Sequence, residues 1–410
     1  MQNVMTVPTT SATANTNGAK PQGRRLRIGF IDYVVEPDKP GVSGLSDNVW
    51  SRAREFAKLG DEVHIVGPYT VEPEPVEGIT VHRYPIPPIG YRNIAGHTML
   101  ILRAWKELRA IPGLDVIHSH DYLSTGIIAP RSSIPVVLTT PGNIYERIAN
   151  GNPFDWTTTQ ALKVAARSSA RYCKLINATS TDMGRWWLLT GAEPERIVVI
   201  PHGVETDVFH RIENAAQQLP LAPGERPIIY IGRLSPEKQV DVLIRAFAAL
   251  TPEFEEARLH VFGKGPQEPE LRALAASLDV SNRVVFHGSV PKHHLPLWYS
   301  AADAVVLPSR SEPLGRVMLE AMACAAPFVA TRVSGPLDHI RHGENGYLVE
   351  PENIEELTAC LRHVLRHPDE ARAVGRRGQE YALQSLTWPR SVARLREAIL
   401  DRLSCPARLT

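Results

Sequence analysis

The chain has 410 residues, of which 43% are hydrophobic and 22% charged, and its formal net charge at pH 7 is +1. This length exceeds what one hydrophobic core usually supports, so we expect two domains of a soluble α/β protein and exclude a coiled coil, a collagen-like repeat and a wholly disordered chain. A balanced charge does not favour a nucleic-acid-binding protein. The four cysteines form no CxxC pair, which argues against a disulfide framework or structural zinc and favours the reducing cytoplasm.

Residues 1–25 are rich in Thr, Ala and Asn and contain no hydrophobic segment. A signal peptide needs such a segment, so we expect a disordered tail here and no secretion signal. Along the rest of the chain, no apolar run reaches the length of a membrane-spanning helix.

Short apolar runs alternate with helical patterns in the first half of the chain. The first predicted helix carries apolar residues from Val49 to Ala57 on one face and ends at Gly60. The predicted strands are Leu26–Asp32, Glu62–Gly67, Val116–Ser119, Val136–Thr139, Leu175–Ala178 and Ile197–Ile200. Strands that alternate with helices form a parallel sheet, so we expect residues 26–203 to make one Rossmann-like domain.

The same pattern starts again after a polar, Pro-containing segment at 204–226, which we interpret as a linker. The predicted strands of this half are Ile228–Gly232, Arg258–Phe262, Val284–Phe286, Ala304–Leu307 and Phe328–Ala330. Residues 227–385 thus predict a second doubly wound domain, and 386–410 a C-terminal helix that packs back on the first. Open parallel sheets bind ligands beyond the carboxyl ends of their strands, so we expect the two domains to face a central cleft that holds the site.

The segment Ser309–Thr331 carries two carboxylates, Glu312 and Glu320, with a Pro-Leu-Gly turn directly after the first. A helix that begins near Gly315 would direct its free N–H groups and positive dipole end at a ligand in the loop, which suits phosphate. Glu320 would then lie about 7.5 Å along the helix axis and reach another part of the same extended ligand. For Glu320 alone an ordinary surface position is the better interpretation, whereas the turn and the small residues of the helix favour a ligand site.

A second group of candidates, Arg233 and Lys238, lies in the loop after the strand Ile228–Gly232. Arginine offers a bidentate fork and lysine a point charge, so the pair suits a diphosphate. Either cation alone would indicate no more than a solvated basic loop. A third segment, 200–209, by itself predicts only a strand followed by a turn.

His118 and His120 alternate along a predicted strand and therefore point to the same face, with Asp121 just beyond the strand. These residues either line the ligand side of the domain or are satisfied core histidines, and the sequence leaves both interpretations open. A zinc site is not expected here, because no third ligand lies nearby.

Together these motifs resemble those of the retaining glycosyltransferases of family 4, which have the GT-B fold, over residues 26–385. That family has a Gly-Arg loop with a following Lys, an Asn-Gly-Val-Asp-x-x-x-Phe segment, and a Glu-Pro-Phe-Gly turn that runs into Leu-Glu-Ala-Met-Ala. The matching residues here are Gly232-Arg233 with Lys238, His202-Gly203-Val204-Glu205 with Phe209, Glu312-Pro313-Leu314-Gly315, and Leu319-Glu320-Ala321-Met322-Ala323.

The resemblance implies transfer of a hexosyl-type sugar from a UDP- or GDP-linked donor to an acceptor hydroxyl, with retained configuration and front-face attack assisted by the leaving phosphate. It implies no metal and no cofactor besides the nucleotide sugar. Arg233 and Lys238 would neutralise the donor diphosphate, Glu312 would contact the transferred sugar, and Glu320 would bind the ribose. His120 and Asp121 would complete the catalytic set from the acceptor side.

Further donor contacts implied by the resemblance are Gly44, Gly232, Gly263, Gly265, Val290, Leu314, Gly315 and Arg316. The chain departs from the family at two positions: Ser43 replaces the first residue of a Gly-Gly pair, and Pro141 replaces a His that touches the sugar. The second departure leaves open a nucleotide-sugar-binding protein without transferase activity. A GT-B-fold nucleotide-sugar epimerase is a further alternative.

The resemblance leaves the acceptor open between a small molecule, a lipid and a glycan. The apolar stretches Trp186–Leu189 and Tyr91–Arg109 suit either helix packing, which is commoner, or contact with a lipid surface. Arg167, Arg171 and Lys174 share one helical face, which is either a solvated surface or a patch for lipid headgroups. The expected location is therefore the cytoplasm, with peripheral contact to the inner membrane surface as an open alternative.

Overall fold

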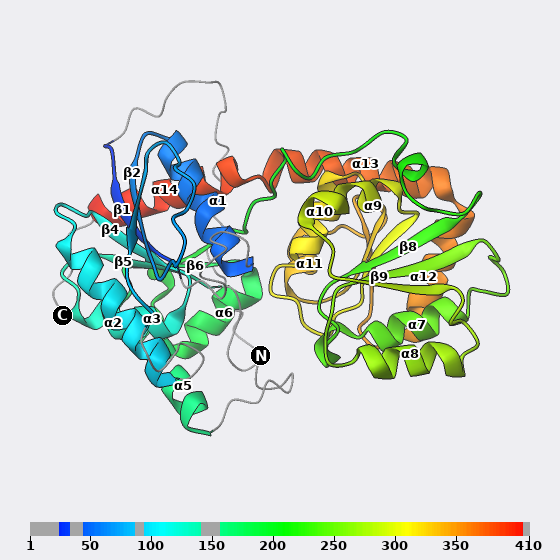
Figure 1. The fold of residues 1–410 in the computed structure, drawn as a ribbon, viewed down its shortest axis with the longest axis horizontal. Coiled ribbons are helices and arrows are strands. Elements are labelled where there is room, and N and C mark those ends of the chain that lie inside the picture. The colour runs from blue at the N-terminus through cyan, green and yellow to red at the C-terminus, as the bar shows by residue number, and fades with distance from the viewer. Residues whose placement is uncertain (1–23, 33–43, 87–93, 141–155, 405–410) are drawn as a thin grey trace, which may run out of the picture. The chain divides into compact units, whose positions relative to one another are not determined.

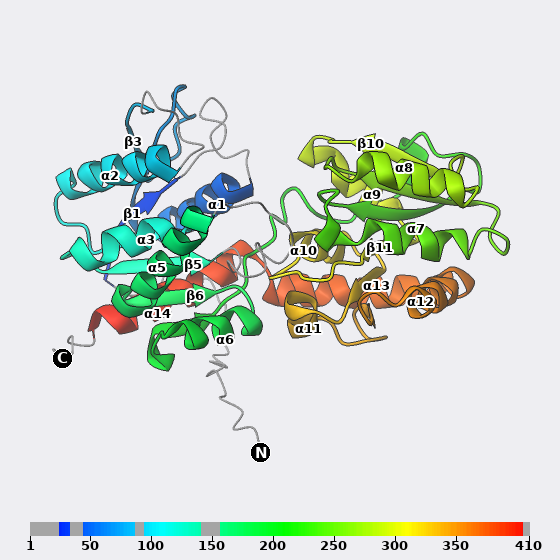
Figure 2. The same ribbon diagram turned by 90° about the horizontal axis from the view of Figure 1, so that it is seen from below.

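The computed structural model describes residues 24–32, 44–86, 94–140 and 156–404. The predicted tail up to residue 23, Ser43 and Pro141 lie outside the described residues. The chain divides into two compact units, the first formed by residues 1–201 and 388–410 and the second by residues 202–387 (Figures 1 and 2).

The first unit is a parallel sheet of seven strands in the order β3-β2-β1-β4-β5-β6-β7. The strands are β1 (Arg27–Ile31), β2 (Glu62–Gly67), β3 (Ile79–Arg83), β4 (Val116–Ser119), β5 (Val136–Thr140), β6 (Leu175–Ala178) and β7 (Ile197–Val199). The helices are α1 (Gly44–Lys58), α2 (Ile94–Ala110), α3 (Tyr122–Ile128), α5 (Trp156–Tyr172), α6 (Thr181–Thr190) and α14 (Trp388–Ser404), with short 3-10 turns η1 (Ala129–Arg131) and η2 (Pro194–Arg196).

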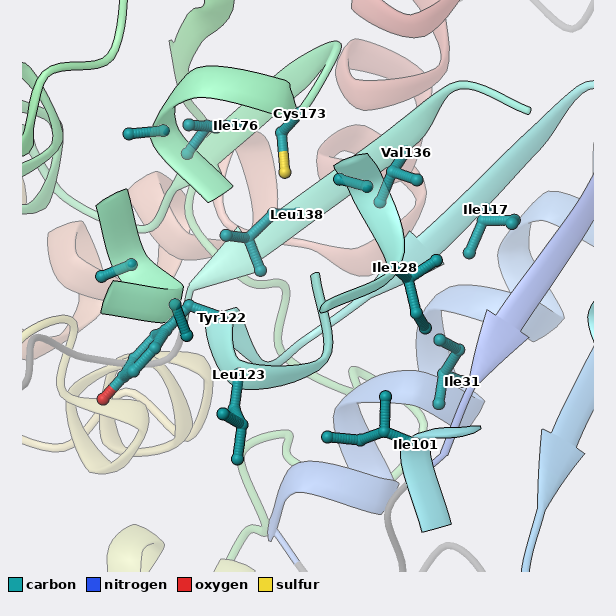
Figure 3. Packing of buried hydrophobic residues seen from close by; sticks show 14 of the residues in the cluster. Ile31, Ile101, Ile117, Tyr122, Leu123, Ile128, Val136, Leu138, Cys173 and Ile176 are labelled. Atoms are coloured by element: carbon teal, nitrogen blue, oxygen red, sulfur yellow. The ribbon is translucent and has the colours of Figure 1, made fainter. Parts of the chain in front are cut away.

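Two apolar cores lie on the two faces of this sheet, because successive side chains of a strand point to opposite sides. Val136 and Leu138 of β5 belong to the core under α2, α3 and α5, whereas Val137 belongs to the core under α1 and α14. Figure 3 shows part of the first core, in which Leu138 lies near Leu123 of α3. Burial on both faces is the reason why β4, β5 and β6 are buried along their whole length.

The second unit is a parallel sheet of six strands in the order β10-β9-β8-β11-β12-β13. The strands are β8 (Arg226–Ile231), β9 (Ala257–Phe262), β10 (Val284–Gly288), β11 (Ala304–Leu307), β12 (Phe328–Thr331) and β13 (Tyr347–Val349). The helices are α7 (Val240–Ala248), α8 (Glu268–Ser277), α9 (Leu295–Ala301), α10 (Arg316–Ala323), α11 (Ser334–His339), α12 (Ile354–Arg366) and α13 (Pro368–Ser385), with 3-10 turns η3 (Ala215–Gln218), η4 (Pro236–Lys238) and η5 (Lys292–His294).

Two parallel sheets flanked by helices confirm the predicted α/β class, and each predicted strand is present with its ends shifted by at most two residues. Strands β3 and β13 were not predicted. β3 is an edge strand without a fully buried residue, so it lacks the apolar run that marks the inner strands. β13 is only three residues long, which is too short for a clear pattern.

Two segments near the boundary between the units belong to a unit that their position in the sequence does not make obvious. Residues 204–226, predicted as a linker, pack within the second unit, since Val204 and Phe209 are buried in its core. α14 returns to the first unit, where its Arg396 makes two hydrogen bonds of 2.7 and 2.9 Å to the carboxylate of Asp61. Among the helices of the described ranges, none is both long and apolar enough to cross a bilayer.

Candidate functional site

Three loops of the second unit follow neighbouring strands of its sheet. Residues 232–239 follow β8, residues 263–267 follow β9, and residues 308–315 follow β11. β8 pairs with both β9 and β11, and all three strands are parallel. The three loops therefore leave the same edge of the sheet, where open α/β sheets bind their ligands.

Two of these loops touch backbone to backbone. A Cβ atom on Gly263 would lie 1.8 Å from the carbonyl oxygen of Gly232, and one on Gly265 would lie 2.0 Å from that of Leu234. The Leu234 N–H also donates to the Lys264 carbonyl oxygen at 3.0 Å. Gly263 and Gly265, both predicted donor contacts, are thus required by the packing of the loops whether or not a ligand is present.

An ion pair joins the first and third loops across 74 positions of sequence. Lys238 Nζ lies 2.5 Å from Glu312 Oε2, and the two side chains are only 19% and 12% exposed. The Arg310 N–H also donates to the Glu237 carbonyl oxygen at 2.8 Å. The structure therefore brings together the two segments that the sequence assigned to one ligand.

Arg233 differs from Lys238 in its exposure to solvent. Its side chain is 64% exposed, and its Nη2 lies 3.3 Å from Glu237 Oε1, which also accepts a 2.6 Å hydrogen bond from the Ser235 hydroxyl. The second oxygen of Glu237 is buried and accepts no hydrogen bond in the described part of the chain. A carboxylate thus holds the guanidinium at the surface of the loop, where it is accessible to an anion.

α10 begins directly after the Pro-Leu-Gly turn, as the sequence predicts. Gly315 has a φ of +83° and precedes the first helical residue, Arg316, so the turn needs a glycine at this position. Leu314 is buried, and a Cβ on Gly335 would lie 2.4 Å from its Cα, so α11 packs closely on the turn. The start of α10 lies beside the Glu312 side chain, since a Cβ on Gly315 would be 3.3 Å from Glu312 Cγ.

Glu320, one turn into α10, is held by a neighbouring phenol. Tyr299 Oη donates to Glu320 Oε2 at 2.9 Å, and Arg316 Nη2 lies 3.8 Å from Glu320 Oε1. Burial, together with the adjacent Glu320, raises the pKa of Tyr299, so the phenol keeps the proton that it donates. Phe209 packs edge-on against Tyr299, with ring centroids 6.0 Å apart. No motif marks Tyr299, which stands in the apolar sequence of α9.

The end of β10 carries a histidine in an aromatic environment. His287 stacks on Phe262 with ring centroids 4.3 Å apart, and its Nε2 lies 2.9 Å from His260 Nδ1. Burial, and next the neighbouring His260, lower the pKa of His287 to about 4, so it is neutral at neutral pH. His260 in turn lies 2.8 Å from Glu225 Oε1. Val290, a predicted donor contact, follows this strand and is half-buried.

In the first unit, α1 begins at Gly44. His120 is buried and directly follows β4. His118 and His120 stack with ring centroids 4.7 Å apart, which confirms that they point to the same face. His118 Nε2 lies 2.9 Å from Thr139 Oγ1, and His120 contacts the guanidinium of Arg52. Both histidines are at most 1% exposed and belong to the interior of the unit.

Arg52 is a buried cation that no sequence motif distinguishes from an ordinary helix-surface arginine. Its side chain is fully buried, and its Nε and Nη2 have no hydrogen-bond partner among the described residues. Burial lowers the pKa of Arg52 to about 9. The ring of Trp388, with its centroid 5.4 Å away, covers the guanidinium from α14.

Asp121 caps α3. Its carboxylate accepts hydrogen bonds from the backbone N–H groups of Leu123 and Ser124 at 3.1 and 3.0 Å, and it lies 3.7 Å from His97 Nε2. Burial opposes its ionisation, but the hydrogen bonds from His97, Ser124 and Leu123 outweigh that effect and lower its pKa. Asp121 is therefore ionised at neutral pH and fixes the start of this helix.

Comparisons with known proteins agree over both units. The model for "Glycosyltransferase Family 4" matches residues 42–208, and that for "Glycosyl transferases group 1" matches residues 211–381. The D-inositol 3-phosphate glycosyltransferase of Thermobispora bispora is 31% identical over 92% of this chain and 95% of its own. The GDP-mannose-dependent alpha-(1-6)-phosphatidylinositol monomannoside mannosyltransferase of Mycolicibacterium smegmatis is 27% identical over 76% of this chain and 85% of its own.

A solved structure gives the same fold. The sucrose-phosphate synthase of Thermosynechococcus elongatus has a TM-score of 0.78 and 22% sequence identity, over 92% of this chain and 99% of that one. The two matched models span most of residues 42–381, and the relative at 31% identity covers 92% of this chain. The chain therefore belongs to the family 4 glycosyltransferases, which use nucleotide sugars and have the GT-B fold.

Proposed function

We propose that this glycosyltransferase moves a hexosyl-type sugar from a UDP- or GDP-linked donor to an acceptor hydroxyl with retention of the anomeric configuration. The observation that carries the proposal is the ion pair between Lys238 and Glu312, which holds a cation and a carboxylate side by side at the sheet edge. A cation and a carboxylate side by side suit a nucleotide-diphosphate sugar, since its phosphate is anionic and its sugar offers hydroxyl donors. The name of the mannosyltransferase relative supports a GDP-linked donor.

The hard step is departure of the nucleoside diphosphate. The bond between the anomeric carbon and the phosphate oxygen breaks, the acceptor oxygen bonds to that carbon on the same face, and the acceptor proton passes to the leaving phosphate. Lys238 and Arg233 stabilise the negative charge that develops on the diphosphate. Both are already held by carboxylates, Glu312 and Glu237, so little reorganisation is needed when the charge appears. No metal ion is required in this scheme.

The remaining residues bind and orient the donor. Glu312 accepts from a hydroxyl of the transferred sugar, and Glu320 accepts from the ribose hydroxyls. Backbone groups of the turn at 314–316 and of Gly232, Gly263 and Gly265 lie against the diphosphate. Gly44 and Val290 are proposed as further contacts at the diphosphate and the base.

The acceptor class follows from the relatives. D-inositol 3-phosphate is named for the relative at 31% identity, so we propose a phosphorylated polyol as the first acceptor to assay, ahead of lipids and glycans. His120 and Asp121 remain proposed acceptor-side residues. For His120 this role requires that the residues around it open, because its side chain is only 1% exposed.

Replacement of the two cations tests the proposal. We expect Lys238→Ala and Arg233→Ala each to lower the turnover number about 100-fold or more, as removal of one fixed donor to a developing anion commonly does. Transfer is measured from a panel of UDP- and GDP-sugars to inositol phosphates, lipids and glycans, and thermal unfolding verifies that each variant folds. Arg245→Ala, an exposed cation on α7 of the same unit, is the matched control and should keep the wild-type rate.

Other outcomes contradict the proposal in distinct ways. Wild-type turnover in either cation variant excludes the assigned role at the diphosphate. Donor binding detected as a thermal shift, without transfer to any acceptor in the panel, supports a nucleotide-sugar-binding protein instead. A changed donor sugar in the absence of acceptor supports an epimerase.

A further inference from the structure

Three side chains of the second unit form a continuous series of hydrogen bonds that ends near the edge of its sheet. Glu225 precedes β8, His260 lies within β9, and His287 lies near the end of β10. Glu225 Oε1 is 2.8 Å from His260 Nε2, and His260 Nδ1 is 2.9 Å from His287 Nε2. The Glu225 and His260 side chains are only 10% and 6% exposed, so these contacts are largely shielded from water.

The Glu225 carboxylate determines where each histidine carries its proton. An ionised carboxylate only accepts hydrogen bonds, and Glu225 Oε2 also accepts from the Ala222 N–H at 3.1 Å. Burial lowers the pKa of both histidines, that of His287 to about 4, so each ring has one proton at neutral pH. His260 therefore donates from Nε2 and accepts at Nδ1. His287 in turn donates from Nε2 and keeps a lone pair on Nδ1.

His287 lies beside the loops of the candidate site. The register of β10 on β9 skips this residue, which forms a β-bulge between Phe286 and Gly288. Bulges redirect a side chain and are common next to active sites. The Gly288 carbonyl oxygen accepts from the Gly263 N–H at 2.8 Å, which joins the end of β10 to the loop after β9. The His287 ring stacks on Phe262, the residue directly before that loop.

The Nδ1 atom of His287 is accessible to a ligand. Within the described ranges it has no hydrogen-bond partner, and it does not belong to the buried polar atoms that lack one, so solvent reaches it. A nitrogen lone pair accepts from an N–H or O–H group. The flat rings around it, with the Trp298 centroid 5.0 Å from that of His287, suit a planar base better than a phosphate.

We propose that His287 Nδ1 accepts a hydrogen bond from a ring N–H of the donor's base and so selects uracil and guanine against cytosine and adenine. The inference rests on the proposed UDP- or GDP-linked donor and deepens it. Uracil and guanine carry a hydrogen on a ring nitrogen of the base-pairing edge, whereas cytosine and adenine have a lone pair at the corresponding nitrogen. Two facing lone pairs repel, so the wrong base leaves His287 without a donor. His260 and Glu225 are positioning residues, which fix the tautomer without touching the ligand.

Isothermal titration calorimetry with the full-length protein tests this selection. Bases of equal ring size are compared, UDP with CDP and GDP with ADP. We expect the wild type to prefer the base with the ring N–H about tenfold or more, because the other base leaves a polar group unpaired. His287→Phe keeps a ring to stack on Phe262 but has no acceptor, so the preference should fall below about twofold. His363→Phe, at a 43% exposed position of α12, is the matched control and should keep the wild-type preference.

Glu225→Gln tests the positioning role, because it alters the series of hydrogen bonds at the end remote from His287. A side-chain amide donates as well as accepts, so every proton of the series is free to reverse and turn His287 Nδ1 into a donor. We expect a weaker base preference in this variant. NMR of 15N-labelled histidine should show the His287 proton on Nε2 in the wild type and partly on Nδ1 in Glu225→Gln. Glu256→Gln, an exposed carboxylate of the same unit, should change neither.

Three results would overturn the inference. They are equal wild-type affinities for the two bases of each pair, an unchanged preference in His287→Phe, and a His287 ring that carries its proton on Nδ1 in the wild type. Equal weakening of all four nucleotides in His287→Phe, with the preference retained, belongs to the second result and would assign the contact to the ribose. Failure of the proposed function looks different, because the base preference then stands while no sugar reaches any acceptor. Thermal unfolding verifies that each variant folds.

Discussion

Two carboxylates of the second unit are positioned by different kinds of partner. Glu312 pairs with the cation of Lys238, while Glu320 accepts a hydrogen bond from the buried phenol of Tyr299. Glu312 is thus held by a charged partner, whereas Glu320 is oriented by a buried neutral donor. This difference suits the proposed roles, in which Glu312 shares its site with an anionic diphosphate and Glu320 binds neutral ribose hydroxyls.

Tyr299→Phe tests the support of Glu320. Removing the hydroxyl leaves a carboxylate oxygen without its donor, so we expect the affinity for UDP or GDP to fall about tenfold, or ~1.4 kcal/mol. Isothermal titration calorimetry measures the nucleotide affinity directly. Tyr347→Phe is the matched control, because the Tyr347 hydroxyl is buried in the same unit and has no hydrogen-bond partner among the described residues. Equal nucleotide affinity for the two variants would show that Tyr299 does not orient Glu320.

The lowered pKa of His287 predicts how the stability of the fold depends on pH. Its pKa is lowered to about 4 by burial and by His260, so between about pH 6.5 and 4 the unfolded chain binds a proton here that the folded chain does not. The contribution of this residue to stability is therefore complete above pH 6.5 and is lost as the pH falls toward 4. We expect His287→Gln to lose less stability than the wild type between pH 7 and pH 5.

Urea unfolding at the two pH values measures this difference. The variant also loses a ring that stacks on Phe262, so only the change between pH values is informative, and not the absolute stability. A wild-type change no larger than that of the variant would mean that His287 titrates normally in the folded protein.

At the scale of elements, the loops after β8 and β9 behave as one structure. Gly265 has no positive φ, and the close approach of the Leu234 backbone is what excludes a side chain there. We expect Gly265→Ala to cost about 1–3 kcal/mol of stability, because the two loops must separate, and to weaken donor binding in parallel. Gly343→Ala tests the other reason why a position needs glycine, which is a positive φ. Gly343 has a φ of +76° but open space around it.

Denaturant unfolding and nucleotide titration of the two glycine variants distinguish these reasons. Gly343→Ala should lower stability by about 1 kcal/mol through backbone strain and leave nucleotide affinity unchanged. If Gly265→Ala bound nucleotide as tightly as the wild type, the contact between the two loops would not shape the donor site.

At the scale of the molecule, the last helix completes the first unit. Asp61 is fully buried and accepts two hydrogen bonds from Arg396, 335 positions further along the chain, and one from the Leu26 N–H. Trp388, Val392, Leu395 and Ile399 of α14 fill the core on this face of the sheet. The first unit therefore depends on residues that are synthesised only after the whole second unit.

Arg396→Ala tests this dependence. The substitution leaves the Asp61 carboxylate buried without its cation. We therefore expect the free energy of unfolding to fall by about 3–5 kcal/mol, as is common when one partner of a buried ion pair is removed. We expect differential scanning calorimetry to show the first unit unfolding at lower temperature, with the second unit unchanged. Glu397→Ala, an exposed neighbour on the same helix, should have no such effect. Simultaneous destabilisation of both units would contradict an independent role for α14.

The sequence by itself determined the class of fold, the inner strands and the family. These depend on signals that neighbouring residues carry together: the period of apolar residues, the turn glycines, and motifs of fixed spacing such as Glu312 with Glu320. The start of α10 after Gly315 could be predicted for the same reason, because the capping residue and the helix are adjacent in the chain.

Only the tertiary structure decided how distant side chains are paired. The contacts of Lys238 with Glu312, Tyr299 with Glu320, and Arg396 with Asp61 join elements that the sequence separates, and either member alone looks like an ordinary helix or loop residue. Burial of His120 against Arg52 is a further example. The physical reason is that desolvation and hydrogen bonding depend on what packs around a group in space, and packing has no signature within a short stretch of chain.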